Sequence, residues 1–286
     1  MLYWWDKDII VPFAEAHKGD RYPRKDGEMK IISLIENTSL NKEMETEHGL
    51  SLYIEFKNHK ILFDMGQSDM FLRNAKKLGV DLSDVDIAIL SHGHYDHGGG
   101  LEEFLKINQK AYVYVSKYAF GTYYNGTEKY IGLNSLLKEN ERLIMTDGRV
   151  ELEEGITLFH CNENIKKYDL GSFGLNVKRE QKYLPDDFFH EQYLLLEEDG
   201  KKVLFSGCSH KGILNIVEWF QPDVLIGGFH FSKLPLDEML KGYANYLNGF
   251  ATAYYTCHCT GEKQFLFMKQ YMERLFYLST GQSIQV

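Results

Sequence analysis

The run SHGHYDHGGGL at residues 91–101 constrains the fold of this chain more than any other part of its sequence. It follows VDIAIL, a short apolar run typical of a buried strand, and it leads into a helical pattern at 99–108. Three histidines and one aspartate fall within six consecutive positions, and these residue types bind metal ions. The three glycines at 98–100 leave room and let the backbone turn directly into the helix. The sequence therefore predicts a metal-binding segment at the end of a strand.

The spacing within this run predicts how ions are held. In an extended segment, positions i and i+2 share a face, so His92 and His94 can bind one ion together. Asp96 and His97 are adjacent, so an extended chain points them apart, and Asp96 can lean toward a second ion. Imidazole nitrogens suit zinc, iron or manganese. We expect one or two divalent metal ions, with zinc as the first choice and iron or manganese as alternatives.

The composition narrows the class of protein. The chain has 286 residues, 44% of them hydrophobic and 26% charged, as in a globular protein with a sizeable core. A net charge of −9 disfavours nucleic acid as a partner, because phosphate neutralisation by basic residues supplies most of that affinity. No apolar run reaches the roughly 18 residues of a membrane helix. Four cysteines are too few for a disulfide framework, and no signal-peptide pattern is present. We expect a cytoplasmic protein that binds no membrane.

The order of the predicted elements indicates an α/β (α+β) fold with a single domain. Strands come first, and strands that alternate with helices follow, as in sheets covered by helices. The expected strands span 29–38, 50–56, 59–66, 85–92, 111–116, 223–230 and 251–259, with a hairpin at 191–210. The expected helices span 68–80, 99–108, 212–220, 235–249 and 261–276.

Two segments depart from this pattern. Residues 1–28 are either an arm that packs on the body or on a neighbouring subunit, or a stretch before a biological start at Met29. Residues 161–187 are polar and aromatic, and we expect a long loop there. Its five basic residues and its aromatic rings suit either a lid over a phosphate-bearing ring or a solvated mobile loop.

Further metal-ligand residues follow other predicted strands. These are Asp64, Cys208, His210, His230 and His258. Because strand ends at one edge of a sheet are where sites collect in α/β folds, we expect them near the 92–97 cluster. The remaining histidines are isolated in the sequence and are interpreted as ordinary surface or core residues: His17, His48, His59, His160 and His190.

The run from His92 to His97 resembles the metal-binding signature of the metallo-β-lactamase fold, a superfamily of hydrolases. Further motifs resemble, in order, the subfamily typified by the archaeal dihydropterin-6-methyl-4-(ribofuranosyl)aminobenzene-phosphate synthase. They are EHGLSLYIE (47–55), ILFDMGQS (61–68), GCSHKGILNIV (207–217), GGFH (227–230) and CHCTGE (257–262). The resemblance covers residues 29–286 and implies a four-layer αβ/βα sandwich with the metals at one rim.

The resemblance also implies a ligand set. A first ion is expected at His92, His94 and His210, and a second at Asp96, His97 and His258. Asp64 matches an aspartate that supports the site by hydrogen-bonding a ligand imidazole. His230 is either a further ligand or a residue behind the ligands.

The chain departs from the superfamily pattern at Cys208, where most members have an aspartate that bridges two metals. The thiol can bind as a thiolate, since a metal lowers its pKa, or it can be a bystander. Cys257 and Cys259 flank His258, and strand alternation points them away from the metal, so we interpret them as packing residues.

Three functions stay open at this stage. The first is a metal-dependent hydrolase of a small phosphorylated or ester-bearing metabolite, with Asp96 orienting an activated water and accepting its proton. The second is a pterin-linked transferase that condenses a dihydropterin diphosphate with an aminobenzene ribofuranosyl phosphate. The third is a non-catalytic metal-binding or sensing protein. Lys211, at a helix start, is a candidate for binding an anionic substrate, and a homodimer is compatible with all three functions.

Overall fold

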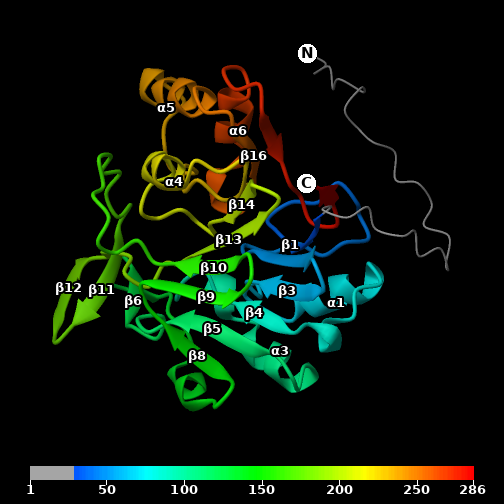
Figure 1. Ribbon diagram of the computed structural model, residues 1–286. Helices are drawn as coiled ribbons and strands as arrows, with labels where there is room; N and C mark the ends of the chain where they lie inside the picture. The colour runs from blue at the N-terminus through cyan, green and yellow to red at the C-terminus, as the bar shows by residue number, and fades with distance from the viewer. Residues whose placement is uncertain (1–28) are drawn as a thin grey trace.

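Two large sheets pack face to face, and helices cover their outer surfaces (Figure 1). The computed structural model describes residues 29–286, so both interpretations of residues 1–28 lie outside the described part of the chain. Each main sheet has seven strands, and a third sheet has four. This architecture confirms the predicted αβ/βα sandwich.

The first sheet has the strand order β18-β1-β2-β3-β4-β5-β8. Its strands are β1 (Lys30–Ile35), β2 (Ser51–Phe56), β3 (His59–Phe63), β4 (Ile87–Ile89), β5 (Tyr112–Ser116), β8 (Leu143–Thr146) and β18 (Ser283–Gln285). Strands β3, β4, β5 and β8 run parallel to one another. Parallel strands end at the same edge, so β3 and β4 bring Asp64 and residues 91–97 together.

The second sheet has the order β17-β16-β15-β14-β13-β10-β9. Its strands are β9 (Arg149–Glu153), β10 (Ile156–Phe159), β13 (Tyr193–Glu198), β14 (Lys201–Phe205), β15 (Val224–Gly227), β16 (Ala253–Thr256) and β17 (Leu275–Tyr277). Strands β14 to β17 are parallel. Their carboxyl ends supply the segments after Phe205, Gly227 and Thr256, which carry the remaining candidate ligands.

The helices form the outer layers. They are α1 (Met70–Lys77) and α3 (Leu101–Ile107) on the first sheet, and α4 (Ile213–Phe220), α5 (Glu238–Asn248) and α6 (Glu262–Met268) on the second. Helix α2 (Tyr95–Gly98) is a single turn inside the metal-binding run. Short 3₁₀ turns cover Leu82–Asp84, Ser135–Glu139 and His258–Thr260. None of the helices in residues 29–286 is both long and apolar enough to cross a membrane.

Alternation along the strands builds the three layers of core. In β3, Ile61 and Phe63 face the second sheet, whereas Leu62 faces the helices α1 and α3. In β14, Phe205 faces the first sheet, whereas Leu204 packs under α4 and α5. Because both faces of these strands are buried, they read in the sequence as continuous apolar runs.

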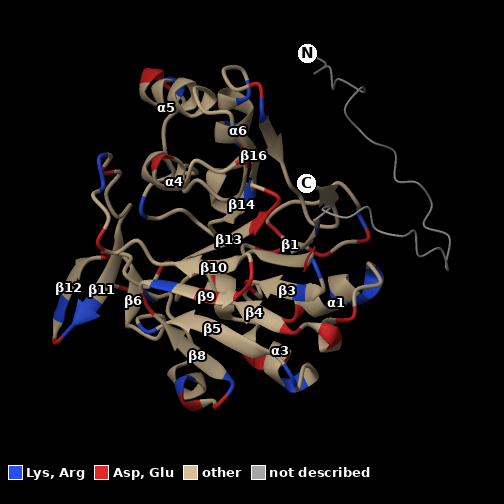
Figure 2. Cartoon of the chain, in the orientation of Figure 1, with Lys and Arg blue, Asp and Glu red and all other residues tan. Residues whose placement is uncertain are grey.

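The prediction of a long loop at 161–187 is wrong for the second half of that segment. Strands β11 (Leu175–Arg179) and β12 (Lys182–Pro185) form a hairpin there, and β11 pairs with β6 (Tyr123–Asn125). With β7 (Lys129–Tyr130) they make the four-stranded sheet, whose β11–β12 end carries basic side chains (Figure 2). The polar sequence gave no strand pattern here, because only Leu175 and Val177 of β11 are buried. They pack on Tyr123 and Phe188.

Two further boundaries differ from the prediction. The helix expected at 261–276 ends at Met268, and the segment Leu275–Tyr277 is instead the edge strand β17 beside β16.

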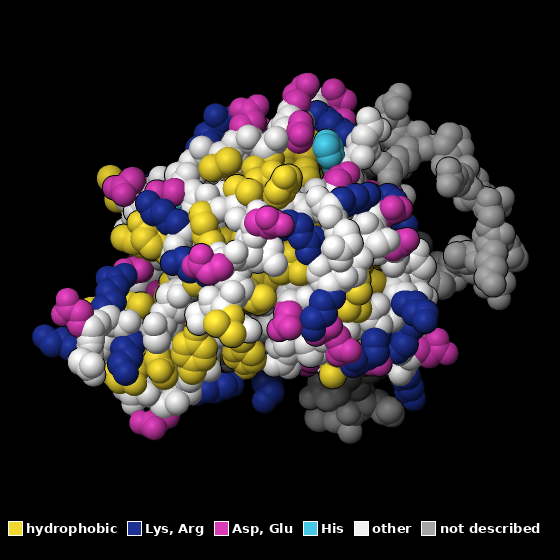
Figure 3. All heavy atoms as spheres, turned by 90° about the horizontal axis from the view of Figure 1, so that it is seen from below, with side chains coloured by type: hydrophobic (Ala, Val, Ile, Leu, Met, Phe, Trp, Pro, Cys, Tyr) yellow, Lys and Arg dark blue, Asp and Glu magenta, His cyan; other side chains and the backbone are white. Residues whose placement is uncertain are grey.

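On the face seen in Figure 3, acidic and basic side chains are interspersed among hydrophobic ones. The described residues on that face therefore present no continuous basic surface.

Candidate metal centre

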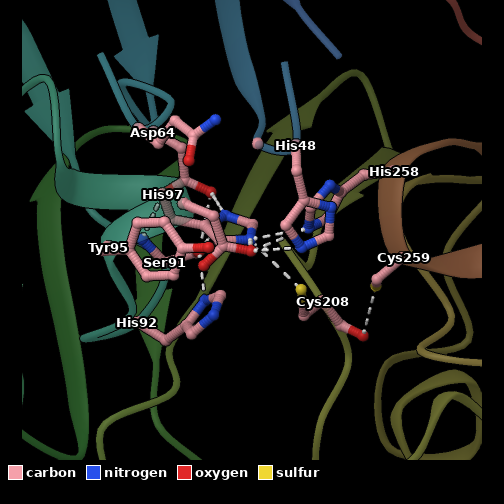
Figure 4. A network of polar contacts seen from close by, with 12 residues as sticks. His48, Asp64, Ser91, His92, Tyr95, His97, Cys208, His258 and Cys259 are labelled. Atoms are coloured by element: carbon pink, nitrogen blue, oxygen red, sulfur yellow. Dashed lines mark hydrogen bonds and ion pairs between the residues drawn. The ribbon is translucent and has the colours of Figure 1, made fainter. Parts of the chain in front are cut away.

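The predicted ligands gather at the carboxyl ends of the two parallel strand sets, where the sheets meet (Figure 4). Residues 91–97 follow β4, Cys208 and His210 follow β14, and His258 follows β16. All of the histidines among them are buried, with exposed fractions of 6% or less. So dense a set of buried imidazoles needs a partner that compensates their desolvation.

One group of donors comprises His92, His94 and His210, which we name the first metal position. The Nε2 atoms of His92 and His210 lie 3.3 Å apart. The imidazole of His94 completes the group, with its ring centroid 4.7 Å from that of His92 and 5.0 Å from that of His210. The sequence prediction for this trio therefore matches three side chains that converge on one point.

A second group comprises Asp96, His97 and His258, which we name the second metal position. The Nε2 atoms of His97 and His258 lie 3.2 Å apart. Asp96 Oδ2 lies 3.4 Å from His258 Nε2 and 3.8 Å from His97 Nε2. The two positions adjoin, because the ring centroids of His92 and His97 are only 4.1 Å apart.

The prediction that Asp96 and His97 point apart is wrong. It assumed an extended chain, but residues 95–98 form the single helical turn α2, with His94 as its extended N-cap residue. A helical turn rotates adjacent side chains by about 100° rather than 180°. Asp96 and His97 can therefore share one position, while His94 still joins His92.

The geometry fits metal ions. Two nitrogens bound at 2.0–2.1 Å to a tetrahedral zinc ion lie about 3.4 Å apart, which is close to the 3.2 and 3.3 Å of the two Nε2 pairs. Among residues 29–286, His94 Nε2 is one of the buried side-chain nitrogens that have no hydrogen-bond partner. The nearest carboxylate oxygen to His94 Nε2, on Asp186, is 3.7 Å away, which is too far for a hydrogen bond. The residues present therefore fit divalent ions at both positions.

Electrostatics distinguish the two positions. Burial, reinforced by the neighbouring histidines, holds the pKa of His92 and His210 well below the usual range, and burial lowers the pKa of His94 to about 4. Burial also disfavours charge on His97, but Asp64 and Asp96 raise its pKa to about 9. The first position thus consists of neutral imidazoles, which is the form that binds metals, whereas the second pairs a carboxylate with histidines.

Asp64 lies behind His97. Its Oδ2 accepts hydrogen bonds from His97 Nδ1 at 2.7 Å and from Ser91 Oγ at 2.7 Å, and its Oδ1 accepts from Ser91 N at 2.7 Å. With Nδ1 of His97 engaged in this way, Nε2 is left to face the second metal position. This is the supporting arrangement that the sequence predicted for Asp64.

Two buried glutamates that sequence reasoning missed position the late histidines. Glu191 accepts hydrogen bonds from the backbone N–H groups of His210 and Lys211 at 2.6 and 3.0 Å. Glu36 accepts from the backbone N–H of His258 at 2.7 Å and from the Tyr277 hydroxyl at 2.8 Å. Each carboxylate fixes the main chain at a ligand, and neither lies in a motif that spacing could have revealed.

His190 and Asp186 support the loop between the first two ligands. Gly93 N donates to His190 Nδ1 at 2.9 Å, so the proton of this imidazole is on Nε2, which lies 3.1 Å from Asp186 Oδ2. A Cβ atom at Gly93 would lie 2.1 Å from the carbonyl oxygen of Ala119, so only glycine fits between the two ligand histidines. The interpretation of His190 as an ordinary histidine misses this role.

The sulfur atoms lie closer to the site than predicted. Cys208 Sγ is 3.2 Å from His97 Nε2, and it forms candidate donor groups with ligands of both metal positions. Cys259 Sγ lies 3.5 Å from the carbonyl oxygen of Cys208 and belongs to a donor group with Cys208 and His258. The interpretation of Cys259 as a packing residue assumed strand alternation, which stops at Thr256 because a 3₁₀ turn follows. Cys257, by contrast, packs in the core between the sheets.

His230 lies beside the first metal position, and it also forms a candidate donor group with Cys208 and His210. Its ring is 4.4 Å from that of His210, and Phe173 covers its other side with a centroid distance of 5.0 Å. Backbone strain marks this region, because Asp64, Ser209, His230 and His258 all have φ between 49° and 62°. Non-glycine residues in this conformation cluster at functional sites, where surrounding contacts enforce it.

Lys211 does not face the donors. Its side chain is buried, and its ammonium donates to the carbonyl oxygens of His160 at 2.6 Å and Glu191 at 2.9 Å. Burial lowers its pKa to about 8. This geometry gives Lys211 a structural role in the loop that carries His210, in place of the expected contact with an anionic substrate.

Comparison with known proteins identifies the family. The model of the metallo-beta-lactamase superfamily matches residues 45–246, and the chain belongs to this superfamily. An uncharacterized protein of Methanocaldococcus jannaschii is 30% identical over 90% of this chain and 100% of its own length. From the same organism, 7,8-dihydropterin-6-methyl-4-(beta-D-ribofuranosyl)-aminobenzene-5'-phosphate synthase is 26% identical over 90% of this chain and 96% of its own.

Solved structures agree with this placement. The crystal structure of Tm1679, described as a metal-dependent hydrolase of the beta-lactamase superfamily, superposes with a TM-score of 0.78 at 29% identity. The match covers 90% of this chain and 99% of that one. The metallo-beta-lactamase fold protein YhfI from Bacillus subtilis shares the fold, with a TM-score of 0.56 at 13% identity over 91% of this chain and 99% of that one.

Proposed function

We propose that this protein is a metal-dependent hydrolase that cleaves a small phosphorylated or ester-bearing metabolite. The observation that carries the proposal is the pair of adjoining donor groups where the two sheets meet. They are His92–His94–His210 and Asp96–His97–His258. Divalent ions bound at such adjoining positions supply activation of a water molecule and stabilisation of negative charge on a substrate oxygen.

The residues of the chain define the remaining roles. Asp96 is the candidate for orienting that water molecule and accepting its proton. Burial opposes its charge, but His97 and the other histidines hold its pKa well below the usual range. It is therefore ionised at neutral pH and can orient a water molecule through a hydrogen bond. Asp64, Glu36 and Glu191 keep the ligands in place so that the substrate meets a rigid site.

The test of this proposal is turnover that depends on both metal and ligands. The full chain, stripped with a chelator and reconstituted with Zn²⁺, Mn²⁺ or Fe²⁺, is assayed with p-nitrophenyl phosphomonoesters, phosphodiesters and carboxylic esters. We expect one of these classes to be hydrolysed, and His92→Ala and Asp96→Asn to lower the rate by roughly 100-fold or more. His59→Ala is the matched control, since His59 pairs with Asp86 far from the donor groups.

A pterin-linked transferase is the second candidate function, and the end-to-end similarity to the pterin-related synthase favours it. Aromatic rings also adjoin the site, because Phe188 stacks on His210 at 4.4 Å and the ring of Phe173 meets that of His230 at 5.0 Å. The discriminating assay is release of diphosphate from a dihydropterin diphosphate, with and without an aminobenzene ribofuranosyl phosphate.

The outcomes separate the candidates. Ester hydrolysis without diphosphate release supports the hydrolase, and diphosphate release that requires the second substrate supports the transferase. Full metal binding without turnover in either assay would favour a metal-binding or sensing protein. A chain that binds no metal would refute the metal centre itself.

A further inference from the structure

His48, to which the sequence prediction gives no role at the site, lies beside His258 (Figure 4), and it forms a candidate donor group with Asp96 and His258. Its Nε2 is 3.2 Å from Asp96 Oδ2, and its ring centroid is 4.7 Å from that of His258. The side chain of His48 is 56% exposed, in contrast to the buried ligands. It is therefore the imidazole that borders both the second metal position and the solvent.

The segment around His48 is built to hold it there. The carboxylate of Glu47 accepts hydrogen bonds from the backbone N–H groups of Gln67 and Ser68 and from the Ser68 hydroxyl, at 2.9, 3.1 and 2.6 Å. On the other side of His48, Leu50 N donates to the carbonyl oxygen of Asp96 at 3.2 Å. The backbone is thus anchored on both sides of the imidazole.

Gly49 permits this close approach. A Cβ atom at this position would lie 2.6 Å from the carbonyl oxygen of Asp96. Any side chain there would push the segment away from the metal-binding loop. The glycine that follows His48 therefore has a steric function at the contact between the two segments.

Asn37 fixes which nitrogen of His48 carries the proton. The backbone N–H of Gly49 can only donate, and it points to Asn37 Oδ1 at 3.4 Å, so the amide oxygen of Asn37 lies on that side. The same oxygen accepts from His258 Nδ1 at 2.8 Å. The amide NH₂ of Asn37 then donates to His48 Nδ1 at 3.3 Å.

The two imidazoles are therefore opposite tautomers. His258 carries its proton on Nδ1 and offers the lone pair of Nε2 to a metal, whereas neutral His48 carries its proton on Nε2 and offers a donor. That donor faces Asp96 Oδ2 at 3.2 Å. A protonated Nε2 cannot bind a metal, so this tautomer argues against a ligand role for His48.

We propose that His48 is a positioning residue, whose Nε2–H donates to the carboxylate of Asp96 and holds it toward the second metal position. This inference rests on the proposed metal centre and adds a residue to it. Outer hydrogen-bond partners of metal ligands are worth about 10- to 100-fold in affinity. We expect His48 to contribute in this way to the second ion and to leave the first ion unaffected.

The test compares His48→Ala with His48→Gln in the full chain. The side-chain amide of glutamine places an N–H near the position of Nε2–H, so it restores a hydrogen-bond donor but not an imidazole. Affinities for two equivalents of Zn²⁺ are measured by chelator competition, and Co²⁺ absorption spectra report the geometry of the ion. His59→Ala is the control, because it removes another histidine paired with an aspartate.

We expect His48→Ala to lower the affinity for the second equivalent of Zn²⁺ by roughly 10-fold or more and to alter the Co²⁺ spectrum. His48→Gln should recover most of the affinity and most of the spectrum. An equal loss of affinity for the second Zn²⁺ in both variants would overturn the inference and indicate that His48 is itself a ligand. Wild-type affinities and spectrum in His48→Ala would also overturn it, while leaving the proposed function intact. If the wild-type chain binds only one equivalent of Zn²⁺, the inference about His48 is overturned. If it binds none, both this inference and the proposed metal centre are overturned.

Discussion

Asp64 Oδ2 accepts a hydrogen bond from His97 Nδ1 at 2.7 Å, and both side chains are completely buried. The aspartate comes from the end of β3 and the histidine from helix α2, two segments that the parallel pairing of β3 and β4 brings together. The backbone of Asp64 is in the left-handed region with φ of 62°, so the chain accepts strain to make this contact. The orientation of His97 thus depends on one carboxylate.

Asp64→Asn tests that dependence. The amide keeps the shape of the carboxylate but loses its charge. Its NH₂ group cannot accept the hydrogen bonds that Ser91 and His97 donate to Asp64. We expect the affinity of the second metal position to fall by roughly 10- to 100-fold. The first position should lose less, because Asp64 reaches its ligand His92 through Ser91 Oγ. Elemental analysis after dialysis against graded chelator concentrations measures both. Asp86→Asn, at the surface pair with His59, should retain wild-type metal content. Equal loss of both ions would instead indicate general unfolding of the site.

Cys208 supplies a prediction about ligand chemistry. Its sulfur is buried and lies 3.2 Å from His97 Nε2, so a metal at the second position has a thiol within reach. A metal promotes ionisation of such a thiol. We expect the Co²⁺-substituted protein to show near-ultraviolet thiolate-to-metal charge-transfer absorption. This band should disappear in Cys208→Ser and persist in Cys257→Ser, whose sulfur packs in the core. A band that persists in Cys208→Ser would make Cys208 a bystander.

The sequence indicated the candidate ligands because they are concentrated in short runs that follow apolar strands. His92, His94, Asp96 and His97 need only local spacing, and β4 fixes where they lie. The supporting residues could not be predicted in this way. Glu36 contacts the backbone of His258, 222 residues along the chain, so its role exists only after the two sheets have packed. Glu191 contacts the backbone of His210 across the β13–β14 hairpin, so its role exists only after that hairpin has formed.

The same reason explains the errors in the fold. The strands with two buried faces gave clear apolar runs, and the strand expected at 50–56 agrees with β2 to within one residue. The hairpin of β11 and β12 has few buried residues, so its strand character depends on pairing with β6. The single helical turns at α2 and after Cys257 could not be predicted from hydrophobic periodicity either, because each is only one turn long.

Lys211 provides a stability prediction. Its ammonium satisfies the carbonyl oxygens of His160 and Glu191, and the side chain is only 2% exposed. In Lys211→Met these buried acceptors lose their donor, which should lower the free energy of unfolding by about 2–4 kcal/mol. Urea denaturation measures this loss, and Lys263→Met, at an exposed position of α6, should stay near wild type. Unchanged stability together with a selective rise in KM would restore the substrate-binding role that the sequence suggested.

His160 predicts how stability depends on pH. Burial, together with the nearby charge of Lys211, lowers the pKa of His160 from 6.5 to about 4. Between these values the unfolded chain binds a proton that the folded chain does not bind, so acidification favours unfolding. The contribution of His160 to stability is thus complete above pH 6.5 and is lost as the pH falls toward 4.

His160→Gln removes this titration, so the free energy of unfolding should fall less steeply with pH in the variant than in the wild type. The expected difference accumulates to about 3 kcal/mol across the interval, since one pKa unit corresponds to about 1.4 kcal/mol. Urea unfolding at several pH values between 6.5 and 4, with chelator present to keep the protein metal-free, gives both curves. Parallel curves for His160→Gln and the wild type would show that His160 titrates alike in the folded and unfolded chains.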